Sequence, residues 1–142
     1  VGIILSLLFM QAEDFTGQLI TGIIFGILII LAMFIHTLGH LISSKMVKAP
    51  VVAVIMTVTV NYLNYGEDGS HPSRVHIGRS LGGPILNIIT ALIMFIVYAF
   101  VLQSHFIAFF GGVNLAVAIV TLSPLPSLDG AVVIREMRDW KS

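Results

Sequence analysis

The chain has 142 residues, of which 57% are hydrophobic and 10% are charged, and its formal net charge is +0. Ordinary soluble proteins carry about 25% charged residues, so this deficit, with a mean hydropathy of +1.03, predicts an integral membrane protein in contact with membrane lipid. The balanced charge gives no reason to expect nucleic acid as a partner. The lack of cysteine excludes disulfides and thiolate metal sites.

The first ten residues are apolar, but a helix needs about 20 residues to cross a ~30 Å hydrocarbon core. They do not resemble a signal peptide, because no basic region or small-residue cleavage site precedes Glu13 and Asp14. We therefore expect residues 1–142 to form a single domain that begins inside a partial N-terminal helix.

Three further segments are long and apolar enough to be membrane spans, at residues 18–44, 81–103 and 105–122. Pro84 suits the first turn of the second of these helices, and Asn114 lies inside the apolar run of the third. The connection around Ser104 is so short that the last two spans must be antiparallel neighbours. The predicted fold class is therefore a membrane α-helical protein.

Residues 51–63 follow Pro50 and are rich in β-branched side chains, which favours a strand or a short β-hairpin in a protein-lined or interfacial place. A short buried helix is the alternative. Residues 64–79 are predicted to form a polar loop, which contains Glu67 and Asp68. Residues 131–142 are expected to form an amphipathic end, with Trp140 at the level of the lipid headgroups.

His36 and His40 lie four residues apart near the end of the first long span. In a helix this spacing places both imidazoles on one face, where they can share a metal ion. A pair of intramembrane histidines can also serve helix packing or hydrogen bonding, so the spacing alone leaves both interpretations open.

The order of the spans brings a third candidate ligand, Asp129, to the same side of the membrane as this histidine pair. Two imidazoles, one carboxylate and an open fourth position form a catalytic type of zinc site. The positive-inside rule makes that side the cytoplasm, because the predicted spans place all seven basic residues there: Lys45, Lys48, Arg74, Arg79, Arg135, Arg138 and Lys141. An Asp-Gly pair after prolines can also be a simple turn.

Three motifs together resemble the site-2 protease family of intramembrane zinc metalloproteases. They are His36-Thr37-Leu38-Gly39-His40, Gly83-Pro84-Ile85-Leu86-Asn87 and Pro124-Leu125-Pro126-Ser127-Leu128-Asp129-Gly130. The resemblance implies a core of three transmembrane helices, zinc as the cofactor, and His36, His40 and Asp129 as its ligands. It also implies that Asn87, Pro124 and Pro126 shape the site or hold substrate, and that the segment at 51–63 is an edge for an extended substrate.

The chain departs from this family at three positions. Thr37 stands where the family has its general-base glutamate, Thr121 where an asparagine is frequent, and Ala131 where a second glycine is common. A threonine hydroxyl cannot accept a proton near pH 7, and general-base catalysis contributes about 10²- to 10⁴-fold to a rate. We therefore expect Thr37 to mark an inactive base position, unless Glu67 or Asp68 substitutes for it.

The preferred interpretation is a catalytically degenerate homologue that keeps the fold and the zinc site and acts as a binding or structural membrane subunit. The first alternative is an active intramembrane zinc metalloendopeptidase that cleaves a transmembrane protein substrate. The second is a subunit of a larger membrane complex that binds haem or a pigment through histidine. A transporter is less consistent with the sequence, because the chain is short and shows no inverted repeat.

Overall fold

We describe the chain from a computed structural model, which covers residues 15–49, 51, 53–56, 61–64 and 71–140. In chain order these residues form α2 (Phe15–Met46), β1 (Ala53–Met56), β2 (Asn61–Asn64), α3 (Ser73–Phe100), α4 (His105–Thr121) and α5 (Asp129–Asp139). The partial helix predicted for residues 1–10 lies outside this range, as do Glu67, Asp68 and Lys141.

Among the described residues, α2 and α3 are long and apolar enough to cross a membrane. At 1.5 Å per residue, α2 is about 48 Å long and α3 about 42 Å long. The helix α4, predicted as a further span, is also apolar but has 17 residues. In the most apolar windows of α2 and α3, only 28% and 22% of the residues are buried. Most of this apolar surface is therefore not covered by other residues of the described structure.

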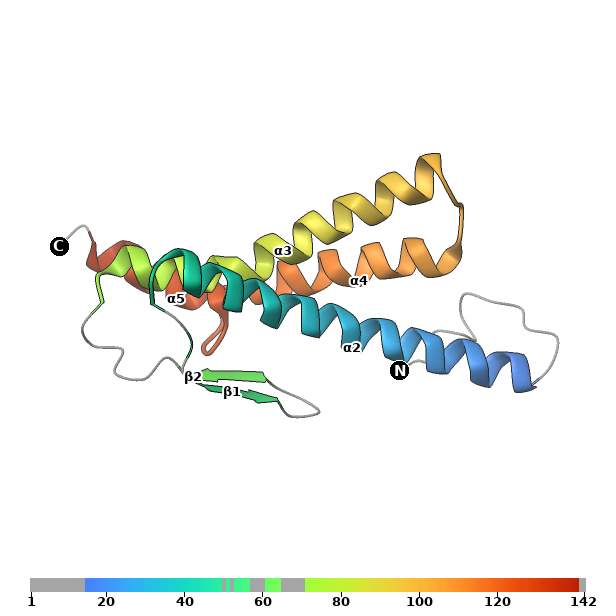
Figure 1. The fold of residues 1–142 in the computed structure, drawn as a ribbon, viewed down its shortest axis with the longest axis horizontal. Helices are drawn as coiled ribbons and strands as arrows, with labels where there is room; N and C mark the ends of the chain where they lie inside the picture. Colours follow the sequence, from blue (N-terminus) through green and yellow to red (C-terminus); the bar gives the residue numbers. More distant parts are fainter. Residues whose placement is uncertain (1–14, 50, 52, 57–60, 65–70, 141–142) are drawn as a thin grey trace.

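The helices α2, α3 and α4 pack against one another (Figure 1). The α3–α4 connection is a tight turn at Val101–Ser104, so these two helices run antiparallel as predicted. Where α2 meets the start of α4, the Phe25 ring is 1% exposed and lies 4.3 Å from the Phe109 ring and 5.5 Å from the Phe106 ring, measured between centroids. This aromatic cluster fixes the end of the bundle that is remote from the histidines.

The helices α2 and α3 are in backbone contact at two glycines, Gly39 and Gly82. A Cβ atom added to Gly39 would overlap the carbonyl group of Gly82, and one added to Gly82 would overlap Ser43. The Ser43 hydroxyl donates to the carbonyl oxygens of His40 (3.1 Å) and Arg79 (3.2 Å). Small residues that permit close backbone approach are typical of helix contacts in membranes. This contact brings main-chain atoms of α3 within hydrogen-bonding distance of side chains on α2.

The helix α3 begins earlier than the sequence predicts. Residues 73–79 were expected to belong to a polar loop, but they form its first turns after Pro72 at the N-cap. Pro84 was expected in the first helical turn and instead lies inside the helix, where it cannot donate to the carbonyl group of residue 80. Hydropathy failed here because it detects the apolar layer, and the polar start of a helix can project beyond that layer.

The strands β1 and β2 form an antiparallel hairpin with Ala53 opposite Asn64 and Met56 opposite Asn61. The hairpin lies near the end of the bundle where α2 ends and α3 begins, and α5 packs against α3 at this same end (Figure 1). Between α4 and α5 the chain makes a local turn, in which the Leu128 amide donates to the Leu125 carbonyl oxygen (3.2 Å) and the Ser127 backbone is in the left-handed region (φ 72°). These connections place the start of α5 beside the C-terminal part of α2.

Candidate metal centre

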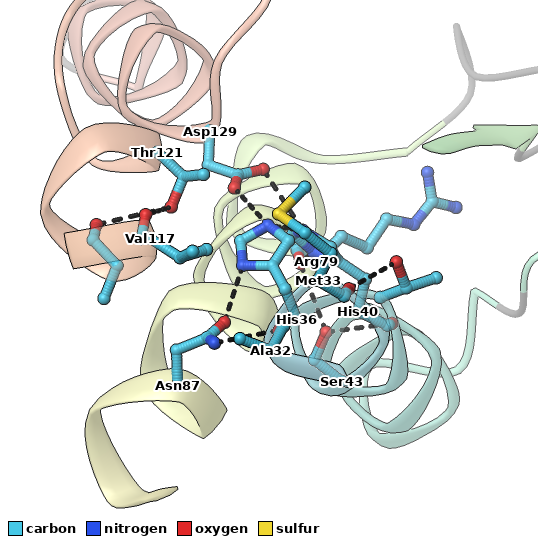
Figure 2. A network of polar contacts seen from close by, with 12 residues as sticks. Ala32, Met33, His36, His40, Ser43, Arg79, Asn87, Val117, Thr121 and Asp129 are labelled. Carbon is cyan, nitrogen blue, oxygen red and sulfur yellow. Dashed lines mark hydrogen bonds and ion pairs between the residues drawn. The ribbon is translucent and has the colours of Figure 1, made fainter. Parts of the chain in front are cut away.

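Three potential ligand side chains meet at the start of α5. His36 and His40 project from one face of α2 and are 8% and 6% exposed, and Asp129 is the first residue of α5. One nitrogen of each histidine and one carboxylate oxygen all lie within 4.8 Å of one another, so the group could hold a metal ion. The convergence predicted from the order of the helices is therefore present in the structure (Figure 2).

The distances within this group are short. His36 Nε2 lies 3.2 Å from Asp129 Oδ2, His40 Nε2 lies 3.4 Å from Asp129 Oδ1, and the two Nε2 atoms are 3.0 Å apart. The two imidazole planes meet at 83°, so the nitrogens approach a common point from different directions. All three side chains therefore direct ligand atoms toward one location.

The hydrogen bonds on the far side of each imidazole determine which nitrogen carries the proton. The amide nitrogen of Asn87 donates to the Ala32 carbonyl group (3.1 Å), so its oxygen must be the atom that lies 2.9 Å from His36 Nδ1. The partner of His40 Nδ1 is the Arg79 carbonyl oxygen at 2.8 Å. Both partners are acceptors only, so both Nδ1 atoms donate and both Nε2 atoms present lone pairs when the rings are neutral.

Two lone pairs and a carboxylate at such distances repel one another unless a shared proton or a cation lies between them. Burial raises the pKa of the Asp129 carboxyl group, but in the metal-free chain hydrogen bonds from His36 and His40, donated by an Nε2 atom that carries a proton, outweigh burial and hold this pKa below its ordinary value. The carboxylate is therefore ionised at neutral pH. The donor set fits a divalent cation such as zinc, whose protein ligands include neutral imidazole and carboxylate.

Gly83 of α3 forms the wall of this centre. A Cβ atom at this position would lie 2.5 Å from His40 Nε2 and 2.6 Å from His36 Cε1. Glycine is therefore required for the imidazoles to occupy their positions. The motif that contains Gly83 was noted in the sequence, but its steric role depends on the α2–α3 crossing, which sequence spacing does not specify.

Thr37 lies next to the first histidine, and its hydroxyl group is directed toward the backbone of its own helix. It is 2% exposed, and its hydroxyl group donates to the carbonyl oxygen of Met33 (3.1 Å) on the same helix. Thr121 likewise donates to backbone carbonyl groups of α4, at 2.9 Å and 3.3 Å. Pro124 and Pro126 are exposed in the turn between α4 and α5, so their predicted contact with substrate stays a prediction.

Sequence reasoning assigned no site role to Asn114 of α4, which is 0% exposed and contacts Asn87. A polar side chain inside an apolar span was the available signal for it. Comparison of the chain with protein-family models, curated proteins and solved structures returned no match.

Proposed function

We propose that this chain is an integral membrane protein of the site-2 protease type that binds zinc through His36, His40 and Asp129 and lacks peptidase activity. The observation that carries the proposal is the pair of Nδ1 hydrogen bonds, which turn both Nε2 lone pairs toward the Asp129 carboxylate. Three protein ligands leave one position for an additional ligand, as in catalytic zinc sites.

Thr37, at the position of the family's general-base glutamate, supports the proposed lack of peptidase activity. Zinc in such a site supplies Lewis-acid polarisation and acidifies bound water. Proteolysis also requires a group that accepts the proton, and Thr37 keeps its hydroxyl on the Met33 carbonyl group. In the described part of the chain, the carboxylate that meets the two histidines is Asp129, which is itself a ligand in this proposal. In this proposal the chain acts as a binding or structural membrane subunit and not as a peptidase.

The exposed surface supports a location in the bilayer. Ile30 of α2 is 70% exposed and Phe100 of α3 is 84% exposed, which suits contact with lipid rather than water. The basic residues of the described ranges belong to the segments at the end of the bundle that carries the metal centre (Figure 1): Lys45, Lys48, Arg74, Arg79, Arg135 and Arg138. By the positive-inside rule we assign this end to the cytoplasmic side.

The geometry is incompatible with one haem ligated by both His36 and His40, whereas ligation of a haem or pigment by a single histidine is tested by the absorption spectrum of the purified protein. Two histidines that ligate one haem approach its iron from opposite faces of the macrocycle. Here both imidazoles come from the same face of α2 and their Nε2 atoms are 3.0 Å apart. No macrocycle can pass between two nitrogens at that distance.

Metal analysis of the purified protein tests the zinc site. We expect about one zinc ion per chain in the wild type and loss of the ion in the His40→Ala variant, because the remaining two ligands no longer enclose it. His105→Ala is the matched control, since His105 opens α4 at the opposite end of the bundle. A wild-type protein without zinc after zinc-supplemented purification would refute the assignment.

Cleavage of a model transmembrane substrate tests the loss of activity. The wild type should show no zinc-dependent cleavage, whereas Thr37→Glu restores a carboxylate at the family's base position and should raise the rate if the rest of the site is intact. Robust wild-type cleavage that disappears in His36→Ala would instead establish the chain as an active intramembrane metalloendopeptidase.

A further inference from the structure

Asn114 lies in the apolar interior of the bundle. Along the sequence, the nearest charged residue is Asp129. It is 0% exposed on α4, a helix that contributes no member to the described ligand group. A buried amide in an apolar layer is costly unless both its donor and its acceptor are satisfied. The partners of Asn114 therefore indicate why a polar residue is present at this depth.

The hydrogen bonds of Asn114 have a defined direction. Its amide nitrogen donates to the carbonyl oxygen of Phe110 (2.9 Å), which fixes the orientation of the amide group. Its oxygen therefore accepts from the amide nitrogen of Asn87, at 2.8 Å. The second amide hydrogen of Asn87 is donated to the Ala32 carbonyl oxygen (3.1 Å). Both donors of Asn87 are thus used, one toward α2 and one toward α4.

This arrangement leaves the Asn87 oxygen as the acceptor that faces His36 Nδ1 (Figure 2). If the amide rotated by 180°, its oxygen would face two acceptors, the Ala32 carbonyl group and the Asn114 oxygen. Its nitrogen would then face His36 and favour the opposite tautomer, with the proton on Nε2. Asn114 and Ala32 together therefore select the tautomer whose Nε2 lone pair faces His40 and Asp129.

We propose that Asn114 is a positioning residue of the metal centre, which acts through Asn87 to hold His36 in its ligand-competent tautomer and orientation. The inference rests on the proposed zinc site and extends it to a helix that supplies no ligand. If Asn114 has this role, the metal centre forms only when α2, α3 and α4 are packed together. A residue that served only helix packing would contribute to stability but would leave the His36 tautomer unchanged.

The test compares Asn114→Leu with Asn114→Asp in lipid nanodiscs. Leucine has the same branched arrangement of side-chain heavy atoms but leaves one Asn87 donor without an acceptor. A buried aspartic acid keeps its proton, so its carbonyl oxygen can accept from Asn87 and its hydroxyl group can donate to Phe110. Thr90→Val is the matched control, because it removes a hydroxyl group that donates only to its own helix, at the Leu86 carbonyl oxygen.

Two readouts are required. The first is the ¹⁵N NMR spectrum of the imidazole nitrogens in metal-free protein, with the His36 signals assigned by their loss in His36→Gln. We expect the Nδ1-protonated form in the wild type, a mixture of tautomers in Asn114→Leu, and recovery of the wild-type form in Asn114→Asp. The second is zinc affinity, measured by competition with a chromophoric chelator. Outer-shell changes typically cost 10- to 100-fold, and we expect about tenfold for Asn114→Leu.

An unchanged His36 tautomer in Asn114→Leu would overturn the inference, and so would an Asn114→Asp protein as impaired as Asn114→Leu. If the leucine variant does not fold, Asn114→Ala also removes the acceptor for Asn87 and provides the same comparison with a smaller side chain. Absence of zinc from the wild type would refute the proposed function instead. The tautomer comparison on metal-free protein would still decide the role of Asn114.

Discussion

Replacement of Gly83 by alanine should abolish metal binding without removing any ligand. The added methyl carbon would lie 2.5 Å from His40 Nε2, whereas ordinary van der Waals contact begins at 3.4 Å, so the imidazole has to retreat by about 0.9 Å. Metal–ligand distances tolerate deviations of only about 0.2 Å. We therefore expect zinc affinity to fall by at least about 100-fold, a loss comparable to that caused by removal of a ligand.

The matched control is Gly112→Ala on α4, where an added Cβ atom has no neighbour within 4 Å. Both substitutions replace a helical glycine, and each should gain about 0.5–1 kcal/mol of intrinsic helix stability. A general effect of alanine on helix formation would therefore appear in both variants. Only the effect on the metal centre should be specific to Gly83.

Zinc affinity should be measured by chelator competition, together with the d–d absorption spectrum after substitution with Co²⁺. The expected result is loss of the tetrahedral Co²⁺ spectrum in Gly83→Ala and its retention in Gly112→Ala. Wild-type affinity in Gly83→Ala would show that the ligand atoms do not lie against α3 as described, and the proposed centre would then be wrong.

Other parts of the structure give further testable outcomes. Asn87→Leu should reduce zinc affinity about 10- to 100-fold by chelator competition, because His36 loses its outer hydrogen bond. Gly39→Ala should lower the thermal midpoint, because its Cβ atom would overlap the Gly82 carbonyl group, while Gly26→Ala meets nothing within 4 Å and should not. Phe25→Ala should reduce the free energy of unfolding by about 3 kcal/mol in denaturant titrations and leave zinc stoichiometry unchanged. The Asp129 carboxyl group, whose pKa lies below its ordinary value, should still be ionised at pH 5, so Asp129→Asn should lower zinc affinity at pH 5 as it does at pH 7; an affinity at pH 5 that this substitution leaves unchanged would contradict the assignment.

The sequence predicted the parts of the fold that depend on hydropathy and spacing. The apolar run predicted at 18–44 lies within α2, and the separation of four residues placed His36 and His40 on one helix face. Counting the spans was sufficient to bring Asp129 to the same end of the bundle. Each of these inferences uses hydropathy, residue spacing or the number of spans, which the sequence provides without knowledge of side-chain packing.

What the sequence did not predict depends on packing between helices. The start of α3 at Ser73 was missed because its first turns are polar, and the interior place of Pro84 was missed for the same reason. The steric role of Gly83 and the link from Asn114 to His36 require the relative rotation of three helices. No periodicity within a single segment carries that information.

The position of Asp129 at the first residue of α5 has a mechanical consequence. The other two ligands belong to α2, so a bound ion would be a reversible cross-link between the first and the last described helices, which most of the chain separates. The packing of α4 on α2 and of α5 on α3 already brings these two helices near each other, so the ion would add a direct link between them. Removal of a bound ion would therefore loosen α5 from α2, while α5 would keep its packing against α3.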